Sequence, residues 1–352
     1  MDRIELPKRP RILVIALRRL GDVLLTTPLI RSLRRAWPDA VIDALVFADT
    51  AGILDGNPDL NGVVAMPPSR TTSQSVALAR QLWRRYDLAI STQPGDRPAF
   101  FAFVAGRVRV GPIEQDANGR LKRMIYSRSA PRTNGVHRVE ENLRLCDLIG
   151  IERVAQVVCP ASATSAQARD SDYAVIHAAP MFRYKRWTTH GWREVAKALA
   201  ARGLTVIATG GPAEHERRYL DEVWSGLGVQ RCDGRLSWPQ LSGLLEKARV
   251  YVGPDTSVTH LAAATACPTV ALYGPTDPRL WGPWPAQGLA TMWADTGTIQ
   301  KRGNVWLVQH AFPCTPCQLE GCERSLESYS ACLDELSAAQ VIEAVDEALK
   351  AH

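Results

Sequence analysis

The sequence predicts an α/β protein made of two domains in series, each a parallel sheet with helices on both faces. The chain has 352 residues, which is too long for one ordinary hydrophobic core. Short apolar strands alternate with amphipathic helices in two separate runs. Between these runs, the stretch 155–172 is small and polar, so we place the domain boundary there. The predicted division is 1–160, a linker 161–172, 173–335 and a terminal helix 336–352.

The elements follow from periodicity and from turn residues. In the first domain the predicted strands are 11–17, 41–47, 63–66 and 88–91, with helices ending at Trp37 and spanning 73–85 and 140–149. Thr27 is the expected N-cap of the first long helix, with Pro28 at its first position. In the second domain we expect strands 173–177, 204–209, 249–252 and 269–273, and helices 192–202, 214–224 and 257–266. Such Rossmann-like lobes bind ligands at the carboxyl ends of their strands.

Composition limits the class of protein. No apolar run approaches the roughly 18–20 residues that cross a bilayer, and the run 12–17 is too short for a signal peptide, so we expect a cytoplasmic protein. Residues 1–165 hold 24 basic against 16 acidic side chains, and only Lys8 and Lys122 are lysines. Arginine forks suit phosphate or carboxylate partners, although a genome rich in arginine codons is an equally good explanation. A nucleic-acid recognition motif is absent from the sequence.

The segment 252–264, Val-Gly-Pro-Asp-Thr-Ser-Val-Thr-His-Leu-Ala-Ala-Ala, is the strongest motif. A strand ends, a Gly-Pro turn follows, and Asp255 is predicted to cap a helix whose first free N–H groups belong to Thr256 and Ser257. A helix start of this kind binds pyrophosphate, and His260 lies one turn further on. The alternative is that these residues only cap and pack the helix.

With the turn Gly274–Pro278, this segment resembles glycosyltransferase family 9, the ADP-heptose:lipopolysaccharide heptosyltransferases. The matching positions are Asp255, Thr256, His260, 262–264 and 274–278. Ser257 departs from the family, which usually has glycine there, so a side chain is added beside the presumed phosphates. The resemblance implies a GT-B fold, in which two lobes face a central cleft and the terminal helix, 338–349, packs back on the first lobe.

The opening loop, 17–30, also resembles the family, which has Leu-Gly-Asp-Val after its first strand. The resemblance makes Asp22 the catalytic base. An inverting transfer needs a carboxylate to take the proton of the attacking hydroxyl. Without the resemblance, Asp22 is an ordinary helix N-cap.

Two further matches concern the nucleotide-sugar donor. Lys185 stands two residues before Trp187, where the family has its phosphate-binding lysine, and its charge would stabilise the departing diphosphate. Glu216, after the strand 204–209, is implied to bind the ribose hydroxyls, with Glu214 as the rival. An exposed lysine and a first-turn helix acid are the alternatives.

The acceptor is expected to meet basic residues of the first lobe. His137 and Arg138 resemble a His-x-x-Glu element of the family. The whole group expected to bind acceptor phosphates or carboxylates comprises Arg18, Arg19, Arg97, Arg120, Arg123, Arg132, His137 and Arg138.

Metal chemistry is not expected in the reaction. No Asp-x-Asp pair follows a strand, so the only small molecule required is the donor, ADP-heptose. Four late cysteines, Cys314, Cys317, Cys322 and Cys332, have irregular spacing that leaves a structural zinc site as an alternative.

The resemblance therefore implies an enzyme that moves heptose from ADP-heptose to Kdo–lipid A, with Asp22 as base. We expect a monomer that touches the inner face of the bacterial inner membrane. Alternatives are a transferase with another donor or acceptor, a sugar-nucleotide epimerase, and a degenerate nucleotide-binding protein. An NAD-dependent oxidoreductase is disfavoured, because neither lobe carries Gly-x-Gly-x-x-Gly after its first strand.

Overall fold

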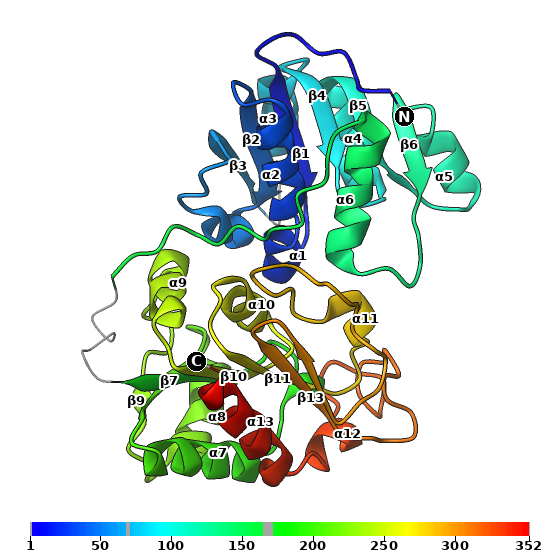
Figure 1. Cartoon of the computed structure of the whole chain (residues 1–352). Coiled ribbons are helices and arrows are strands. Elements are labelled where there is room, and N and C mark those ends of the chain that lie inside the picture. Colours follow the sequence, from blue (N-terminus) through cyan, green and yellow to red (C-terminus); the bar gives the residue numbers. More distant parts are fainter. Residues whose placement is uncertain (1, 68–70, 165–171, 352) are drawn as a thin grey trace. The chain divides into compact units, whose positions relative to one another are not determined.

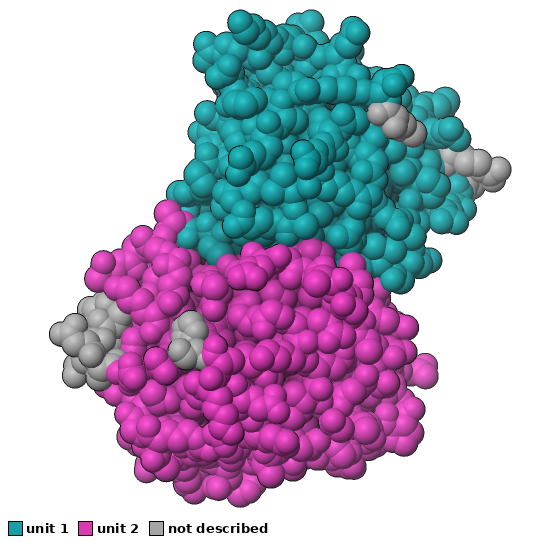
Figure 2. Space-filling model, viewed as in Figure 1, with its two compact units in different colours: residues 1–160 teal, residues 161–352 magenta. Residues whose placement is uncertain are grey.

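The computed structural model describes residues 2–67, 71–164 and 172–351, and for Thr72, Ala117, Asn118 and Arg120 it describes the backbone alone. The chain divides into two compact units, Met1–Pro160 and Ala161–His352 (Figure 2). Residues 165–171 of the expected linker lie outside the described residues. No helix in the described part of the chain is long and apolar enough to cross a membrane.

The first unit is built on a six-stranded parallel sheet in the order β3-β2-β1-β4-β5-β6 (Figure 1). Its strands are β1 (Arg11–Ala16), β2 (Val41–Phe47), β3 (Gly62–Met66), β4 (Tyr86–Ser91), β5 (Gly106–Ile113) and β6 (Arg128–Pro131). From β1 the successive strands β2 and β3 are added on one side, and from β4 the strands β5 and β6 are added on the other, so the strand order reverses between β1 and β4. Loops that leave these two strands at their carboxyl ends therefore diverge and leave room for a ligand.

The helices of the first unit are α1 (Leu20–Leu24), α2 (Thr27–Ala36), η1 (Ala48–Leu54), α3 (Thr72–Leu82), α4 (Asp96–Ala105), α5 (Ala117–Lys122) and α6 (Arg138–Ile149). Thr26, not Thr27, is the N-cap of α2. Helix α2 packs against α6, and α3 packs against α4 (Figure 1). The segment 96–131 escaped the prediction because α4 has no clear apolar face and β5 begins with alternating arginines.

The second unit repeats the plan with seven strands in the order β12-β13-β11-β10-β7-β8-β9. These are β7 (Tyr173–His177), β8 (Thr205–Thr209), β9 (Gln230–Arg231), β10 (Val250–Pro254), β11 (Thr269–Tyr273), β12 (Ile299–Arg302) and β13 (Val305–Gln309). Pairing is parallel except between β12 and β13, which form an antiparallel edge that the sequence did not reveal. Here the order reverses between β7 and β10.

The helices of the second unit are η2 (Arg183–Lys185), α7 (Thr189–Ala201), α8 (Glu214–Trp224), α9 (Trp238–Glu246), α10 (Ser257–Ala264), α11 (Pro278–Trp281), α12 (Ala331–Asp334) and α13 (Ala338–Lys350). One face of the sheet is covered by α7, α8 and α13, whose buried side chains share a core cluster with β7, β8, β10, β11 and β13. The sequence analysis missed α9, although Ser237 and Gln240 form a capping box at its start.

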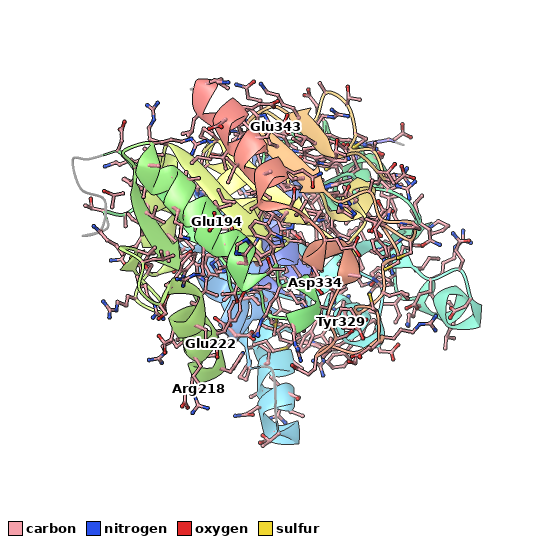
Figure 3. All side chains as sticks on the ribbon, turned by 90° about the horizontal axis from the view of Figure 1, so that it is seen from below. Glu194, Arg218, Glu222, Tyr329, Asp334 and Glu343 are labelled. Carbon is pink, nitrogen blue, oxygen red and sulfur yellow. The ribbon has the colours of Figure 1, made fainter. Side chains whose placement is uncertain are left out.

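The expectation that the terminal helix packs on the first lobe is wrong. The buried face of α13, formed by Val341, Ala344, Val345 and Ala348, belongs to the core of the second unit. Figure 3 shows α13, marked by Glu343, beside α7, marked by Glu194. The amphipathic pattern of 338–349 establishes only that one face is buried, and it does not identify the surface that covers this face.

Candidate active site

Asp22 lies where β1 gives way to α1, at the reversal of strand order in the first unit. Its side chain is inside the first turn of α1 and only 8% exposed, while Arg19 is the N-cap. The interpretation of Asp22 as an N-cap is therefore wrong. A buried carboxylate that does not cap a helix needs other charged or hydrogen-bonding partners.

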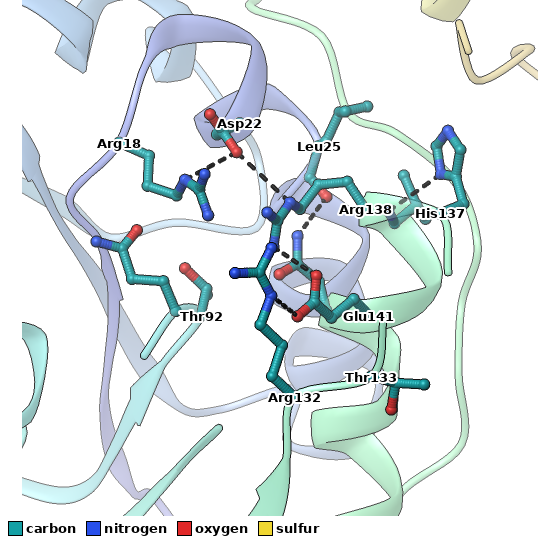
Figure 4. Close-up of polar contacts among 12 residues, drawn as sticks. Arg18, Asp22, Leu25, Thr92, Arg132, Thr133, His137, Arg138 and Glu141 are labelled. Carbon is teal, nitrogen blue, oxygen red and sulfur yellow. Dashed lines mark hydrogen bonds and ion pairs between the residues drawn. The ribbon is translucent and has the colours of Figure 1, made fainter. Parts of the chain in front are cut away.

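Those partners are two guanidinium groups on one carboxylate oxygen. Arg18 Nε lies 2.9 Å and Arg138 Nε lies 3.5 Å from Asp22 Oδ1 (Figure 4). Among the described residues, no hydrogen bond is donated to Oδ2. Asp22 is thus oriented through one oxygen and keeps the other for a ligand.

Arg138 connects Asp22 to α6. It is 3% exposed, and its Nη1 donates to Glu141 Oε2 at 2.6 Å, while Arg132 Nε lies 3.5 Å from Glu141 Oε1. Burial and the nearby positive charge of Arg18 lower the pKa of Arg138, and the charges of Glu141 and Asp22 oppose this shift. The network Arg18–Asp22–Arg138–Glu141–Arg132 thus alternates in sign. Glu141 has a central place in it that the sequence did not assign.

Neutral side chains fix the loops around this network. Asn142 Nδ2 donates to Leu25 O at 2.9 Å, and Gln93 Nε2 donates to Leu17 O at 2.9 Å. The first bond links α6 to the end of α1, and the second links the loops that follow β4 and β1. Neither residue was singled out from sequence, because a hydrogen bond to a distant carbonyl leaves no local pattern.

The other expected acceptor residues are only partly brought together. His137 is buried, and its Nδ1 accepts the N–H of Val139 as the N-cap of α6. Arg19 and Arg97 are exposed, the latter on α4, and no described contact joins Arg97 to Asp22. The side chain of Arg120 lies outside the described residues.

In the second unit, Lys185 and Asp255 meet across the reversal of strand order. Lys185 ends η2 after β7, and Asp255 follows β10 directly. Lys185 Nζ donates to Asp255 Oδ2 at 2.5 Å, and the two side chains are 19% and 8% exposed. The pair closes the gap between the two loops.

Asp255 is held by both of its oxygens. Thr276 Oγ1 donates to Oδ2 at 2.7 Å, Tyr273 OH donates to Oδ1 at 3.4 Å, and His260 Nε2 lies 3.9 Å from Oδ1. Burial by itself would raise the pKa of Asp255, but the charges of Lys185 and His260 and the hydrogen bonds from Lys185 and Thr276 lower it overall. The carboxylate therefore stays ionised and anchors the lysine. Tyr273 and Thr276 were missed, although Thr276 lies in the Gly-Pro-Thr-Asp-Pro turn.

The start of α10 differs from the prediction. Its N-cap is Thr256, whose side chain accepts from Thr259 N, and Asp255 precedes the cap. Ser257 is the first helical residue, half-buried, and it is not among the residues with positive φ. Gly253 is tightly enclosed, since a Cβ there would lie 2.1 Å from Tyr251 OH. The helix start thus presents Thr256 and Ser257 next to the Lys185–Asp255 pair.

Of the two acidic candidates after β8, Glu216 is the better placed. Its Oε2 accepts the N–H of Gly211 at 2.7 Å, which holds the carboxylate against the loop at the strand end. Glu214 is exposed and paired with Arg218 on the helix surface.

The late cysteines are all free thiols, with Cys314 and Cys322 exposed and Cys332 buried. Burial, together with the other thiols nearby, raises the pKa of Cys332 to about 11. In the described part of the chain, which includes all four, no group of three His, Cys, Asp or Glu side chains is arranged to hold a metal ion. The structure gives the zinc alternative no support.

Two Rossmann-like units, each with its charged site at the reversal of strand order, define the class of two-lobed GT-B glycosyltransferases. The chain belongs to glycosyltransferase family 9 (heptosyltransferase), whose model matches residues 75–306. The predictions of family, of fold class and of glycosyltransferase activity are confirmed.

Named relatives are similar over most of their length. Lipopolysaccharide heptosyltransferase 3 of Escherichia coli is 28% identical over 294 residues, 78% of this chain and 86% of that protein. Lipopolysaccharide heptosyltransferase 1 of Pseudomonas aeruginosa is 29% identical over 328 residues, 89% of this chain and 87% of that protein.

Solved structures support the fold. A family 9 glycosyltransferase from Veillonella parvula superposes with a TM-score of 0.81 at 19% identity, covering 100% of both chains. The Escherichia coli heptosyltransferase WaaC, solved with ADP, gives a TM-score of 0.74 at 22% identity and covers 96% of this chain and 99% of that one.

Proposed function

We propose that the enzyme is an inverting heptosyltransferase of lipopolysaccharide biosynthesis that moves heptose from ADP-heptose to the Kdo–lipid A inner core. The observation that carries the proposal is the geometry of Asp22, whose Oδ1 forms ion pairs with Arg18 and Arg138 while Oδ2 accepts no hydrogen bond from a described residue. The names of the relatives, lipopolysaccharide heptosyltransferases 1 and 3, support the substrate class.

In the proposed reaction, Asp22 Oδ2 takes the proton of an acceptor hydroxyl. The hydroxyl oxygen forms a bond to the anomeric carbon, and the bond from that carbon to the diphosphate breaks, so its electron pair leaves with ADP. Arg18 and Arg138 keep the carboxylate from rotating away during this step. Arg19, Arg97, Arg120 and His137 are the further proposed contacts for acceptor phosphates or carboxylates.

The donor is proposed to bind on the second unit. Lys185 meets the diphosphate, and the first N–H groups of α10, at Ser257 and beyond, donate to its oxygens. Asp255 holds Lys185 Nζ in place, and Thr256 and His260 flank the same helix start. Glu216 binds the ribose, since its Oε2 is already fixed by Gly211 and the carboxylate follows the end of β8.

The experiment for the function is a transfer assay with ADP-heptose and Kdo–lipid A, without added divalent metal, followed by mass spectrometry of the product. We expect the mass of one heptose to be added. Calorimetry with ADP, UDP and GDP runs beside it, with ADP expected to bind in preference. Transfer from a UDP-sugar or GDP-sugar instead would keep the enzyme class and overturn the donor, and tight nucleotide binding with no transfer to any acceptor would favour a degenerate protein.

A matched pair of variants tests the donor site. Lys185→Ala should weaken ADP binding about 10- to 100-fold, because a charge-assisted contact to phosphate is lost. Arg183→Ala is the control, since Arg183 belongs to the same short helix but is exposed. Calorimetry that finds equal affinity for wild type and Lys185→Ala would remove Lys185 from the donor site.

A further inference from the structure

One surface of the first unit combines exposed apolar side chains with unpaired cations. Seven of the described large hydrophobic side chains of this unit are more than a third exposed, and five of them lie on α4 or α5 or within two residues of the ends of α3 and α5. These five form the apolar part of what we call the α4–α5 surface: Trp83, 59% exposed; Phe100, 48%; Phe103, 44%; Leu121, 64%; and Met124, 75%.

The surface is continuous and hollowed. Phe100 and Phe103 are one turn apart on α4 and, with Leu121 and Ile125, line a pocket of about 350 Å³. The end of α3 joins it, because the N–H of Arg84, next to Trp83, donates to Val104 O at the end of α4. Lys122 also lines the pocket, and its charge is neutralised by ion pairs with Asp96 at 3.0 Å and Glu114 at 2.9 Å.

Five arginines on or next to α3, α4, α5 and β5 have no ion-pair partner in the described part of the chain. Arg84, Arg97, Arg107 and Arg123 are exposed, Arg109 is half-buried, and none of the five has an ion pair within the described residues. Arg109 lies over the ring of Phe103, 5.5 Å from its centroid, so the positive charge is held on the aromatic surface itself. Burial and the neighbouring charge of Arg84 lower the pKa of Arg109.

Exposed aromatic and aliphatic side chains on the same elements as exposed arginines suit the boundary between water and lipid. Trp and Phe rings settle at the headgroup level, arginines extend their charges to lipid phosphates, and the two effects add. A second copy of the chain fits worse. A two-fold contact would bring the same unpaired arginines of two subunits close together, and the charges would repel.

We propose that the α4–α5 surface is the membrane-docking surface of the enzyme and that its partner is an anionic phospholipid bilayer. The proposal extends the proposed function, since a lipid-linked acceptor lies in such a bilayer. Binding to lipid is nevertheless separable from transfer, because none of the tested residues belongs to the proposed catalytic or substrate-binding groups.

The test is cosedimentation of the full chain, without substrates, with phosphatidylethanolamine vesicles containing phosphatidylglycerol and with neutral phosphatidylcholine vesicles. Wild type should bind the anionic vesicles and lose binding as salt rises. Phe100→Ser/Phe103→Ser and, separately, Arg84→Glu/Arg107→Glu should each reduce binding at least about tenfold. Wild type that stays in solution with anionic vesicles, or variants that bind as wild type does, would overturn the proposal.

Matched controls come from the second unit. Met181→Ser/Met292→Ser removes exposed apolar side chains, 72% and 42% exposed, and Lys247→Glu/Arg324→Glu removes exposed cations. Both should bind vesicles like wild type. Sedimentation velocity tests self-association, and a wild-type dimer that the Phe100→Ser/Phe103→Ser variant abolishes would assign the surface to a second copy and overturn lipid docking.

Transfer to two acceptors separates this proposal from the function. The surface variants should be slow on Kdo–lipid A embedded in vesicles and normal on a deacylated, water-soluble acceptor. If wild type binds vesicles but transfers to neither acceptor, the function fails while the docking surface stands. If it transfers to both equally well and ignores vesicles, the docking surface fails alone.

Discussion

Asp22 and Asp255 both lie at the reversal of strand order, one in each unit, and they differ in how their carboxylate oxygens are used. Each follows a central strand at the reversal of strand order, and each is 8% exposed. Both contacts of Asp22 converge on Oδ1. Asp255 is contacted at Oδ2 by Lys185 and Thr276 and at Oδ1 by Tyr273 and His260.

The difference shows how one residue type takes two roles on one fold. A carboxylate offers about four acceptor positions. Asp255 uses both oxygens to hold a cation and neighbouring loops, so it has little capacity left for a substrate proton. Asp22 is oriented by its arginines and retains an oxygen. The pattern of partners, and not burial or position, distinguishes the proposed base from the anchor.

The largest expected effect comes from Asp22→Asn, which keeps the shape of the side chain and removes its basicity. We expect kcat to fall about 10²- to 10⁴-fold, the usual contribution of a general base, with the Kd for ADP unchanged. Asp59→Asn is the control, because Asp59 is buried in the same unit and paired with Arg31 at 2.8 Å. Steady-state kinetics that show equal losses in both variants would trace the effect to folding and remove Asp22 as base.

The second unit also contains a group that acid should destabilise. His177 ends β7, where its Nδ1 is 3.0 Å from Thr209 Oγ1, and burial lowers its pKa to about 4 from the ordinary value of 6.5. The unfolded chain therefore binds more protons than the folded one between these values. The free energy of unfolding should fall by about 3 kcal/mol as pH drops from about 6.5 to about 4, and His177 should add no pH dependence above that window.

Urea unfolding at several pH values measures this slope. His177→Gln should flatten it, whatever the variant does to stability at neutral pH. A wild-type slope that is unchanged in His177→Gln would assign the acid sensitivity to other groups.

Asp255→Asn tests the role of anchor by stability. Removing one partner of a buried ion pair costs about 3–5 kcal/mol, and the 19% exposure of Lys185 reduces our expectation to about 2 kcal/mol. Asp22→Asn should cost less than Asp255→Asn, because Arg138 keeps Glu141 as a partner. Calorimetric unfolding of both variants decides, and an Asp22→Asn variant that is the less stable of the two would reverse the comparison.

The local sequence pattern predicted many of the strands and helices, and there are physical reasons why it missed the others. Strand–helix alternation located β1, β2, β7, β8, β10 and β11, because buried parallel strands are continuous apolar runs. It missed α4 and β5, where arginines and an even apolar distribution hide the period.

The site shows the same division. Motifs placed Asp22, Lys185 and Asp255 at strand ends, since loops of fixed length follow the strands. Glu141 and Tyr273 were not found, because their contacts join residues far apart in the sequence. For the same reason the sequence analysis assigned α13 to the first lobe, whereas its buried face packs in the core of the second unit. The pattern within one helix contains no information about the surface against which the helix packs.

The smallest expected effect concerns Ser257, where the sequence departs from the usual glycine. A glycine would be needed if the backbone had positive φ, but Ser257 is the first residue of α10 and lies outside the positive-φ set. The remaining question is steric, since the side chain stands where phosphate oxygens are proposed to bind. Serine and glycine differ by less than about 1 kcal/mol at a helix start, so we expect Ser257→Gly to change the Kd for ADP less than about threefold and kcat as little. Calorimetry gives the Kd for ADP and steady-state kinetics give kcat for this variant. A tenfold gain in affinity would mean that the Ser257 hydroxyl obstructs the diphosphate, so that the proposed donor site of the second unit would be less suited to its ligand than the proposed base of the first unit is to its reaction.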